Sequence, residues 1–318
     1  MELIISKIAS IFLIIFVGFI ANKAGVMPMS ANKLFVNLLL KVTCPCMILA
    51  SITSSELQDD TITVTIQTFA GGCIFLLVGA GIGYVLARLI KVDSDQIGPY
   101  AFSFGSINNG FIGFPVTAAL FGSNILYLMV IHNIALQAMY LYTVGPAIVA
   151  LGSGERSKFS IRGVFSSLKN INTITAAVSV LMLVLGLHLP SVAFDCMDMI
   201  GDATTPLSML IVGMQLGDSK LSEVVRSKKL FIFSAVKMIL LPVLTFLAVN
   251  WLPISADVKV CMIIAASFPV AVAVVPVISE EERNSLPAAQ MVTLTTLISL
   301  AVIPVTASLL MSYYGIGL

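Results

Sequence analysis

Long apolar runs recur from one end of this sequence to the other, and they constrain the possible folds more than any other feature. Each run has about 20 residues, enough for a helix to cross about 30 Å of hydrocarbon. Backbone polar groups in lipid must be satisfied within the segment, and the runs lack the alternation of barrel strands. The sequence therefore predicts an all-α polytopic membrane protein with ten transmembrane helices, at residues 3–22, 33–53, 62–90, 97–121, 123–149, 171–189, 192–216, 230–251, 257–279 and 286–312.

Composition agrees with a lipid environment and excludes several classes of protein. Of 318 residues, 58% are hydrophobic and 10% are charged, against about 25% charged in soluble domains. A net charge of +1 argues against nucleic acid as a partner, since that binding needs clustered Lys and Arg. The five cysteines lie inside apolar runs and are expected to pack as small hydrophobes. We expect no cofactor and no metal site.

The most polar connector, residues 152–170, divides the predicted helices into an N-terminal repeat (1–151) and a C-terminal repeat (171–318). The connector is either a basic amphipathic segment on the cytoplasmic surface or a solvated linker. If it is cytoplasmic, the same side collects most of the positive charge, in agreement with the positive-inside rule, and both termini lie outside. The residues on that side are Lys23, Lys33, Arg88, Lys91, Arg156, Lys158, Arg162, Lys169, Lys220, Arg226, Lys228, Lys229 and Arg283.

Five helices per half, an odd number, place the second half upside down relative to the first. This inverted five-helix repeat is typical of secondary transporters, whose site lies near the midplane between the halves. The two halves have prolines at similar positions. Residues 106–116 of the fourth span read SINNGFIGFPV, and residues 267–277 of the ninth read SFPVAVAVVPV. Aligning Pro115 with Pro276 places Asn108 opposite Pro269.

The fourth and ninth spans are predicted to be broken helices that cross each other. Gly and Pro disfavour a helix by about 1 and 3 kcal/mol, and the fourth span has three Gly and one Pro between residues 105 and 115. Unwound backbone at membrane depth is tolerated where it lines a cavity, and there it exposes donors for a carboxylate. Close packing of kinked helices is the simpler alternative. The predicted substrate-binding residues are Asn108, Asn109, Gly110, Pro115, Pro269 and Pro276.

Four ionisable side chains inside predicted spans are candidates for a functional role, since a charge there is unfavourable by about 2.5 to 3.5 kcal/mol on insertion scales. Lys41 and Asp202 occupy equivalent spans and precede Pro45 and Pro206 by four residues, so we expect them to approach as an ion pair or a proton-coupling pair. Two unrelated residues facing water would be the alternative. Lys237 is a candidate counter-ion for an anion, or it reaches to the membrane interface. His132, near Asn133 and Gln137, is a candidate proton relay.

Several segments together resemble the auxin efflux carrier family, which includes plant PIN proteins and bacterial malate or malonate permease-like members. They are FVGFIANKAGVMP (16–28), the second span around Pro45, NNGFIGFP (108–115), TTPLSMLIVGMQL (204–216) and LTTLISLAVIPV (294–305). The resemblance implies two inverted five-helix repeats, a crossover of helices four and nine, a homodimer in the plasma membrane, and organic anion transport. Asn172 is followed by Thr173 where the family pattern suggests Pro.

Other functions remain open at this level. A sodium-coupled symporter of the bile acid type shares the broken-helix crossover, but the ninth span is almost entirely Ala, Val and Pro. A proton-coupled or uncoupled carrier fits that composition better. A membrane-embedded enzyme would need a metal or acid-base motif such as HExxH, and none occurs. A channel differs from a carrier in lacking saturable uptake.

Overall fold

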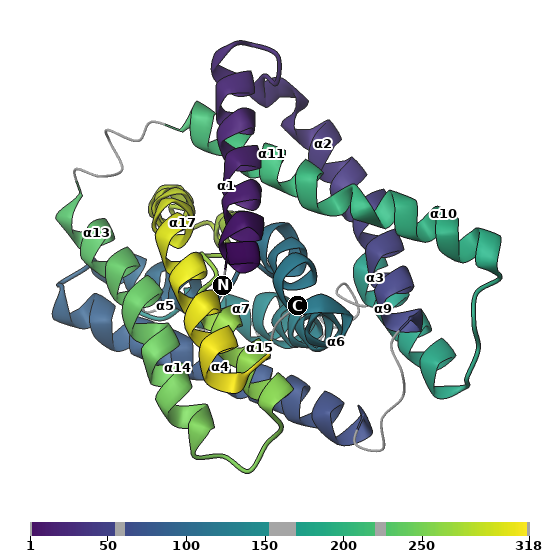
Figure 1. The fold of residues 1–318 in the computed structure, drawn as a ribbon. Helices are drawn as coiled ribbons and strands as arrows, with labels where there is room; N and C mark the ends of the chain where they lie inside the picture. The colour runs from purple at the N-terminus through teal and green to yellow at the C-terminus, as the bar shows by residue number, and fades with distance from the viewer. Residues whose placement is uncertain (1, 55–60, 153–169, 220–226, 317–318) are drawn as a thin grey trace.

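The chain is built from helices in every part that the structure describes (Figure 1). A computed structural model describes residues 2–54, 61–152, 170–219 and 227–316, and no strand occurs among them. The first half contains α1 (Glu2–Lys23), η1 (Met29–Ala31), α2 (Asn32–Leu38), η2 (Leu39–Thr43), α3 (Cys44–Thr53), α4 (Thr61–Leu89), η3 (Ser94–Gln96), α5 (Ile97–Gly105), η4 (Asn109–Gly113), α6 (Phe114–Ile134), η5 (Ala135–Val144) and α7 (Gly145–Val149).

The second half begins after the connector, whose residues 153–169 lie outside the described part of the chain. Its helices are α9 (Ile171–Val184), α10 (Ser191–Asp202), α11 (Thr204–Asp218), α13 (Lys228–Ala235), η6 (Val236–Leu240), α14 (Leu241–Asn250), α15 (Ala256–Ala266), α16 (Val274–Glu280) and α17 (Leu286–Tyr314). Each of the ten predicted ranges is largely helical. The predicted limit between the fourth and fifth falls at Gly122, which breaks α6 with a φ of 77°.

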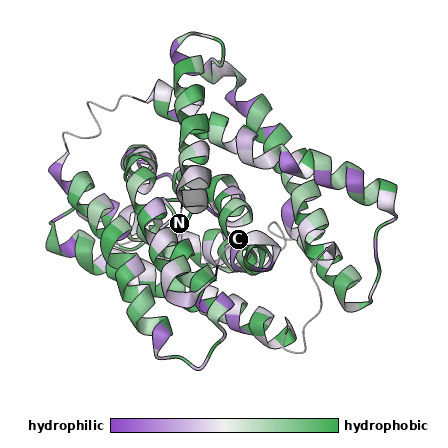
Figure 2. Ribbon diagram, viewed as in Figure 1, coloured by the Kyte–Doolittle hydropathy of each residue, from purple (hydrophilic) through white to green (hydrophobic). Residues whose placement is uncertain are grey.

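Five helical stretches are long and apolar enough to cross a membrane, judged over the described residues. They are Met29–Thr53, Thr61–Leu89, Ser94–Val149, Lys228–Asn250 and Leu286–Tyr314. Hydrophobic residues cover much of the outer surface of these helices (Figure 2). Ile74, Val243 and Leu309 are 63%, 51% and 64% exposed. Such faces are suited to lipid tails and not to water.

Widened π turns precede four of the prolines. The turns η2, η4, η5 and η6 come directly before Pro45, Pro115, Pro146 and Pro242. Proline has no N–H, and its ring clashes with the carbonyl four residues earlier. A π turn opens the helix locally and accommodates that clash, and such turns are frequent at functional sites. These prolines therefore bend helices without ending them.

The helices pack into two groups. The first group consists of α1, α2, α3, α9, α10 and α11, and the second of α4, α5, α7 and α13 to α17, while α6 contacts both. Within the first group, α1 and α11 lie against each other because Gly18 and Gly213 leave room for backbone contact. A Cβ on Gly18 would collide with the carbonyl oxygen of Leu210, and one on Gly213 with that of Ile15. Small residues commonly allow this close approach between membrane helices.

Candidate functional site

Two helices of the second group are interrupted at the centre of the molecule. The helix α5 ends at Gly105, and the chain is non-helical until η4 begins at Asn109. The helix α15 ends at Ala266, and α16 begins only at Val274. The predicted breaks in the fourth and ninth spans are therefore present. Each break places the C-terminal end of one short helix near the N-terminal end of the next.

Hydrogen bonds join the two breaks directly. The backbone N–H of Asn108 donates to the carbonyl oxygen of Pro269 over 2.8 Å. The N–H of Ala271 donates to the Ser106 hydroxyl over 3.3 Å. A third bond anchors the second break, because the N–H of Val270 donates to Oγ1 of Thr295 in α17 over 3.1 Å. The unwound peptides thus find partners in each other, as buried backbone must.

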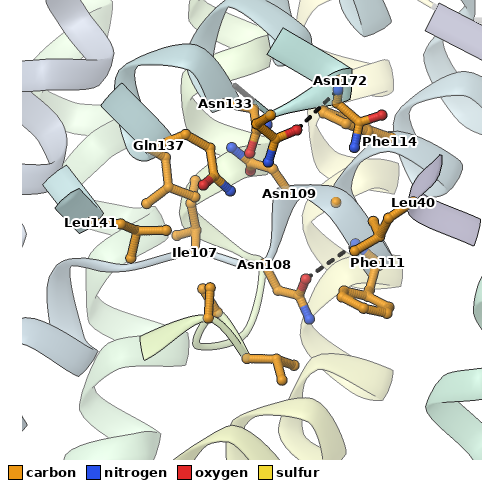
Figure 3. Close-up of a pocket in the computed structure, with 16 residues that line it drawn as sticks. Leu40, Ile107, Asn108, Asn109, Phe111, Phe114, Asn133, Gln137, Leu141 and Asn172 are labelled. Atoms are coloured by element: carbon orange, nitrogen blue, oxygen red, sulfur yellow. Dashed lines mark hydrogen bonds between the residues drawn. The ribbon is translucent and has the colours of Figure 1, made fainter. Parts of the chain in front are cut away.

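A cavity of about 100 Å³ opens beside the breaks (Figure 3). Both groups of helices contribute to it: Leu40 and Asn172 come from the first group, and Ala271 comes from the second. The cavity is lined by Leu40, Ile107, Asn108, Asn109, Gly110, Phe111, Phe114, Asn133, Leu136, Gln137, Leu141, Asn170, Asn172, Ala271, Val272 and Ala273. It therefore lies at the boundary between the two groups.

Carboxamides supply the polar side chains of the cavity, and no charged side chain lines it among the described residues. The side chain of Asn108 caps η4 by accepting from the N–H of Phe111 over 3.2 Å. Within the described chain, Oδ1 of Asn109, Oε1 of Gln137 and Oδ1 of Asn172 are buried without a hydrogen-bond partner. Buried polar atoms are rarely left unpaired. This cluster is therefore suited to a polar ligand.

Backbone donors also occur at the second break, beside the cavity. Hydrogen bonds among the described residues leave the N–H groups of Val272 and Ala273 unused, and both residues line the cavity. They precede α16, whose N-terminal end carries a partial positive charge. Unpaired amides at a helix N-terminus form a ready site for an anion. Two backbone donors therefore precede α16 beside the cavity.

The structure brings some of the predicted binding residues together at this cavity. Asn108, Asn109 and Gly110 line it. Pro115 and Pro269 are buried beside the breaks, and Pro269 takes part through its carbonyl oxygen. Pro276 is the third residue of α16 and is exposed, outside the cavity lining. These prolines shape the breaks and are not in the cavity wall.

His132 contacts Asn109 on the side away from the cavity lining. Its Nδ1 is 3.3 Å from Nδ2 of Asn109, and its ring packs edge-on against Phe75 with centroids 5.7 Å apart. The side chain is fully buried, and its Nε2 has no partner among the described residues. The histidine is thus in contact with a cavity residue but does not line the cavity itself. The proton relay stays a prediction.

The three charged candidates lie in different surroundings. Lys41 and Asp202 are both exposed, and no ion pair joins them in the described chain, although η2 contacts α10. Their pairing stays a prediction, which a double-mutant cycle in an uptake assay tests: independent, additive defects would count against it. Lys237 is fully buried and does not line the cavity; its ammonium group contacts the end of α5.

Several site residues were not among the predicted ones. Asn133 follows His132 directly and Gln137 lies five residues after it, and their carboxamides were a usable signal. Asn170 caps α9, and Asn172 follows in its first turn. Nothing in the local sequence indicates that these two reach the cavity, because that depends on how α9 packs against α3. Ser106 and Thr295 were also missed, since a hydroxyl in an apolar helix is most often bonded to its own backbone.

These features define a class: a helical membrane protein in which two interrupted helices meet at a small polar cavity between two helix groups. Residues 3–307 match the model of a family described as membrane transport protein. The chain belongs to this family, and its resemblance to the auxin efflux carriers is confirmed. The protein is therefore a membrane transporter.

A curated relative is similar over part of the chain. An uncharacterized transporter of Methanothermobacter thermautotrophicus (strain Delta H) is 24% identical over 160 residues, which cover 50% of this chain and 51% of the relative. The match thus spans about half the length of that relative. The relative is described as a transporter, which agrees with the family of membrane transport proteins.

Proposed function

We propose that this protein is a secondary transporter that carries small organic anions, mono- or dicarboxylates such as malate or malonate, by alternating access. The observation that carries the proposal is the bonded pair of helix breaks beside a cavity at the boundary between two helix groups. Anionic groups would accept from the free N–H groups of Val272 and Ala273 and from carboxamide N–H groups of the cavity. Movement of one helix group against the other would then expose the cavity to each side in turn.

The size of the cavity supports a small substrate. Its volume of about 100 Å³ is below the range of about 300 to 1,000 Å³ that is usual for sites that hold drug-sized ligands. A solute of a few carbon atoms fits this space better than a molecule the size of a bile acid. Short carboxylates are therefore favoured over the substrates of the bile acid symporters.

Ten membrane-spanning helices in two inverted repeats complete the proposal. The positions of Pro115 and Pro276 support the inversion, because each lies near the N-terminal end of the helix that follows a break. The contact between Asn108 and Pro269, which the alignment of the two halves placed opposite each other, supports it as well. We place the protein in the plasma membrane, with both termini outside, as a homodimer, and take protons or no ion as the coupling partner.

A thermal-shift screen of the purified protein tests the substrate class. Malonate and malate should raise the Tm, since a ligand stabilises the state that it binds. At a hundredfold excess over Kd the free energy of unfolding rises by about 2.7 kcal/mol. Malonamide is the matched control, because it has nearly the same size and lacks the charge. If a neutral or cationic solute gives a shift while every carboxylate gives none, the anion assignment is wrong.

A further inference from the structure

The ammonium group of Lys237 is held by backbone carbonyls at the first helix break. Its Nζ donates to the carbonyl oxygen of Phe104 over 2.6 Å and to that of Ser106 over 2.8 Å. The side chain is fully buried, and the ammonium lies 5.5 Å from the centre of the Phe104 ring. The lysine sits in the π turn η6, which lies before Pro242 and widens the helix at this point.

These carbonyls form the kind of site that holds a metal cation in other transporters. The C-terminal end of a helix carries a partial negative charge, and α5 ends at Gly105 between the two carbonyls. Unwound carbonyls and half-helix C-terminal ends coordinate Na⁺ in broken-helix carriers. Here the cation is the ammonium group of Lys237, which is part of the chain and donates to two such carbonyls.

The lysine is also connected to the second break through Ser106. The carbonyl of Ser106 accepts from Lys237, and its hydroxyl accepts from the N–H of Ala271. Ala271 lines the cavity, and the lysine does not. The positive charge therefore stabilises the geometry of both breaks from behind the cavity wall, without touching the space for a solute.

We propose that Lys237 is a tethered cation that takes the place of a monovalent coupling ion at the end of α5. It is a positioning residue: it completes the crossing of the two breaks without sodium. The inference rests on the proposed function. A tethered cation at this position makes transport independent of sodium and separates the protein from sodium-coupled symporters. Loss of the ammonium should leave a vacant carbonyl site that a free cation of similar charge can enter.

Two variants separate the loss of charge from the loss of volume. Lys237→Ser removes the ammonium and leaves space, whereas Lys237→Met fills the space with an apolar chain. Purified protein is unfolded by heat in choline chloride, and NaCl or KCl replaces the choline at constant ionic strength. Lys259→Ser is the control, because Lys259 is only partly buried and its Nζ contacts a single carbonyl, that of Asn250, at 3.5 Å.

The intact protein and Lys259→Ser should have the same Tm in choline and in sodium. Both Lys237 variants should have a lower Tm in choline, by roughly 5 to 10 °C, because the end of α5 loses its cation. Sodium or potassium should raise the Tm of Lys237→Ser in a saturable way and leave that of Lys237→Met unchanged.

The proposal is overturned if Lys237→Ser responds to the cations no more than Lys237→Met does. It is equally overturned if the intact protein shows a saturable stabilisation specific to sodium, a measurement that stands even where neither variant folds. No carboxylate is present in these experiments. Failure of the carboxylate screen and failure of this inference are therefore distinguishable.

Discussion

Carboxamide side chains give the cavity its polarity at the scale of single residues. Asn108 is the last residue of the first break, and Asn109 begins η4. Asn133 comes from α6, Gln137 from η5 and Asn172 from α9. A carboxamide can donate and accept, so it can contact either a carboxylate or a hydroxyl. The charged candidates Lys41, Asp202 and Lys237 all lie outside the cavity lining. An anionic substrate of the kind proposed would therefore be bound by backbone dipoles and amide donors.

Asn108 offers a substitution that changes charge while keeping the hydrogen bond. In Asn108→Asp, the new carboxylate still accepts from the N–H of Phe111, so the cap of η4 is retained and the Tm should change little. A negative charge beside an anionic substrate is repulsive by several kcal/mol. We expect the apparent KM for malonate to rise by about tenfold or more, measured as uptake into proteoliposomes.

The control for this variant is Asn124→Asp, since Asn124 is exposed and lies away from the cavity lining. It introduces the same charge and should leave uptake unchanged. Stronger binding of malonate by Asn108→Asp, or equal effects of the two substitutions, would speak against an anion in this cavity.

At the scale of elements, glycine and proline determine where the helices are interrupted. The breaks after Gly105 and before Val274 were predicted from clusters of these residues, because glycine and proline both disfavour a helix. The participation of Asn170, Asn172 and Thr295 could not be predicted in this way. Their place depends on which helices pack together, and no local pattern encodes that. Pro276 lies in the helix that follows the second break and is not among the residues that line the cavity.

Gly105 allows the first break to pack against its neighbours, and this predicts a measurable loss of stability. A Cβ there would collide with the hydroxyl oxygen of Tyr140 and lie 2.5 Å from the carbonyl oxygen of Leu76. Overpacking of this kind is destabilising by about 1 to 3 kcal/mol. Gly105→Ala should therefore lower the Tm of the purified protein and impair uptake.

The matched substitution is Gly81→Ala in α4. No heavy atom lies within 4 Å of a Cβ at Gly81, and alanine is favoured over glycine in a helix by about 1 kcal/mol. The Tm of this variant should stay the same or rise slightly. An unchanged Tm for Gly105→Ala would show that the close packing around the break is not needed.

At the scale of the whole molecule, the cavity lies where the two groups of helices meet. The first group closes on itself through the contact of α1 with α11 at Gly18 and Gly213, and the second group carries both interrupted helices. Ten membrane crossings stay a prediction, but the positions of most helices were predictable from apolar runs. Their division into two groups was not, because it depends on contacts between helices that are far apart in sequence. The proposal of alternating access rests on that division.

Counterflow tests this account most directly. Proteoliposomes are loaded with an excess of the unlabelled carboxylate that gives the largest thermal shift, and a trace of the labelled compound is added outside. A carrier with one cavity exposed to each side in turn should accumulate label transiently above its equilibrium level, and Asn108→Asp should lose this overshoot while Asn124→Asp keeps it. Saturable entry without an overshoot, or flux that rises linearly with concentration, would contradict the alternating-access cavity.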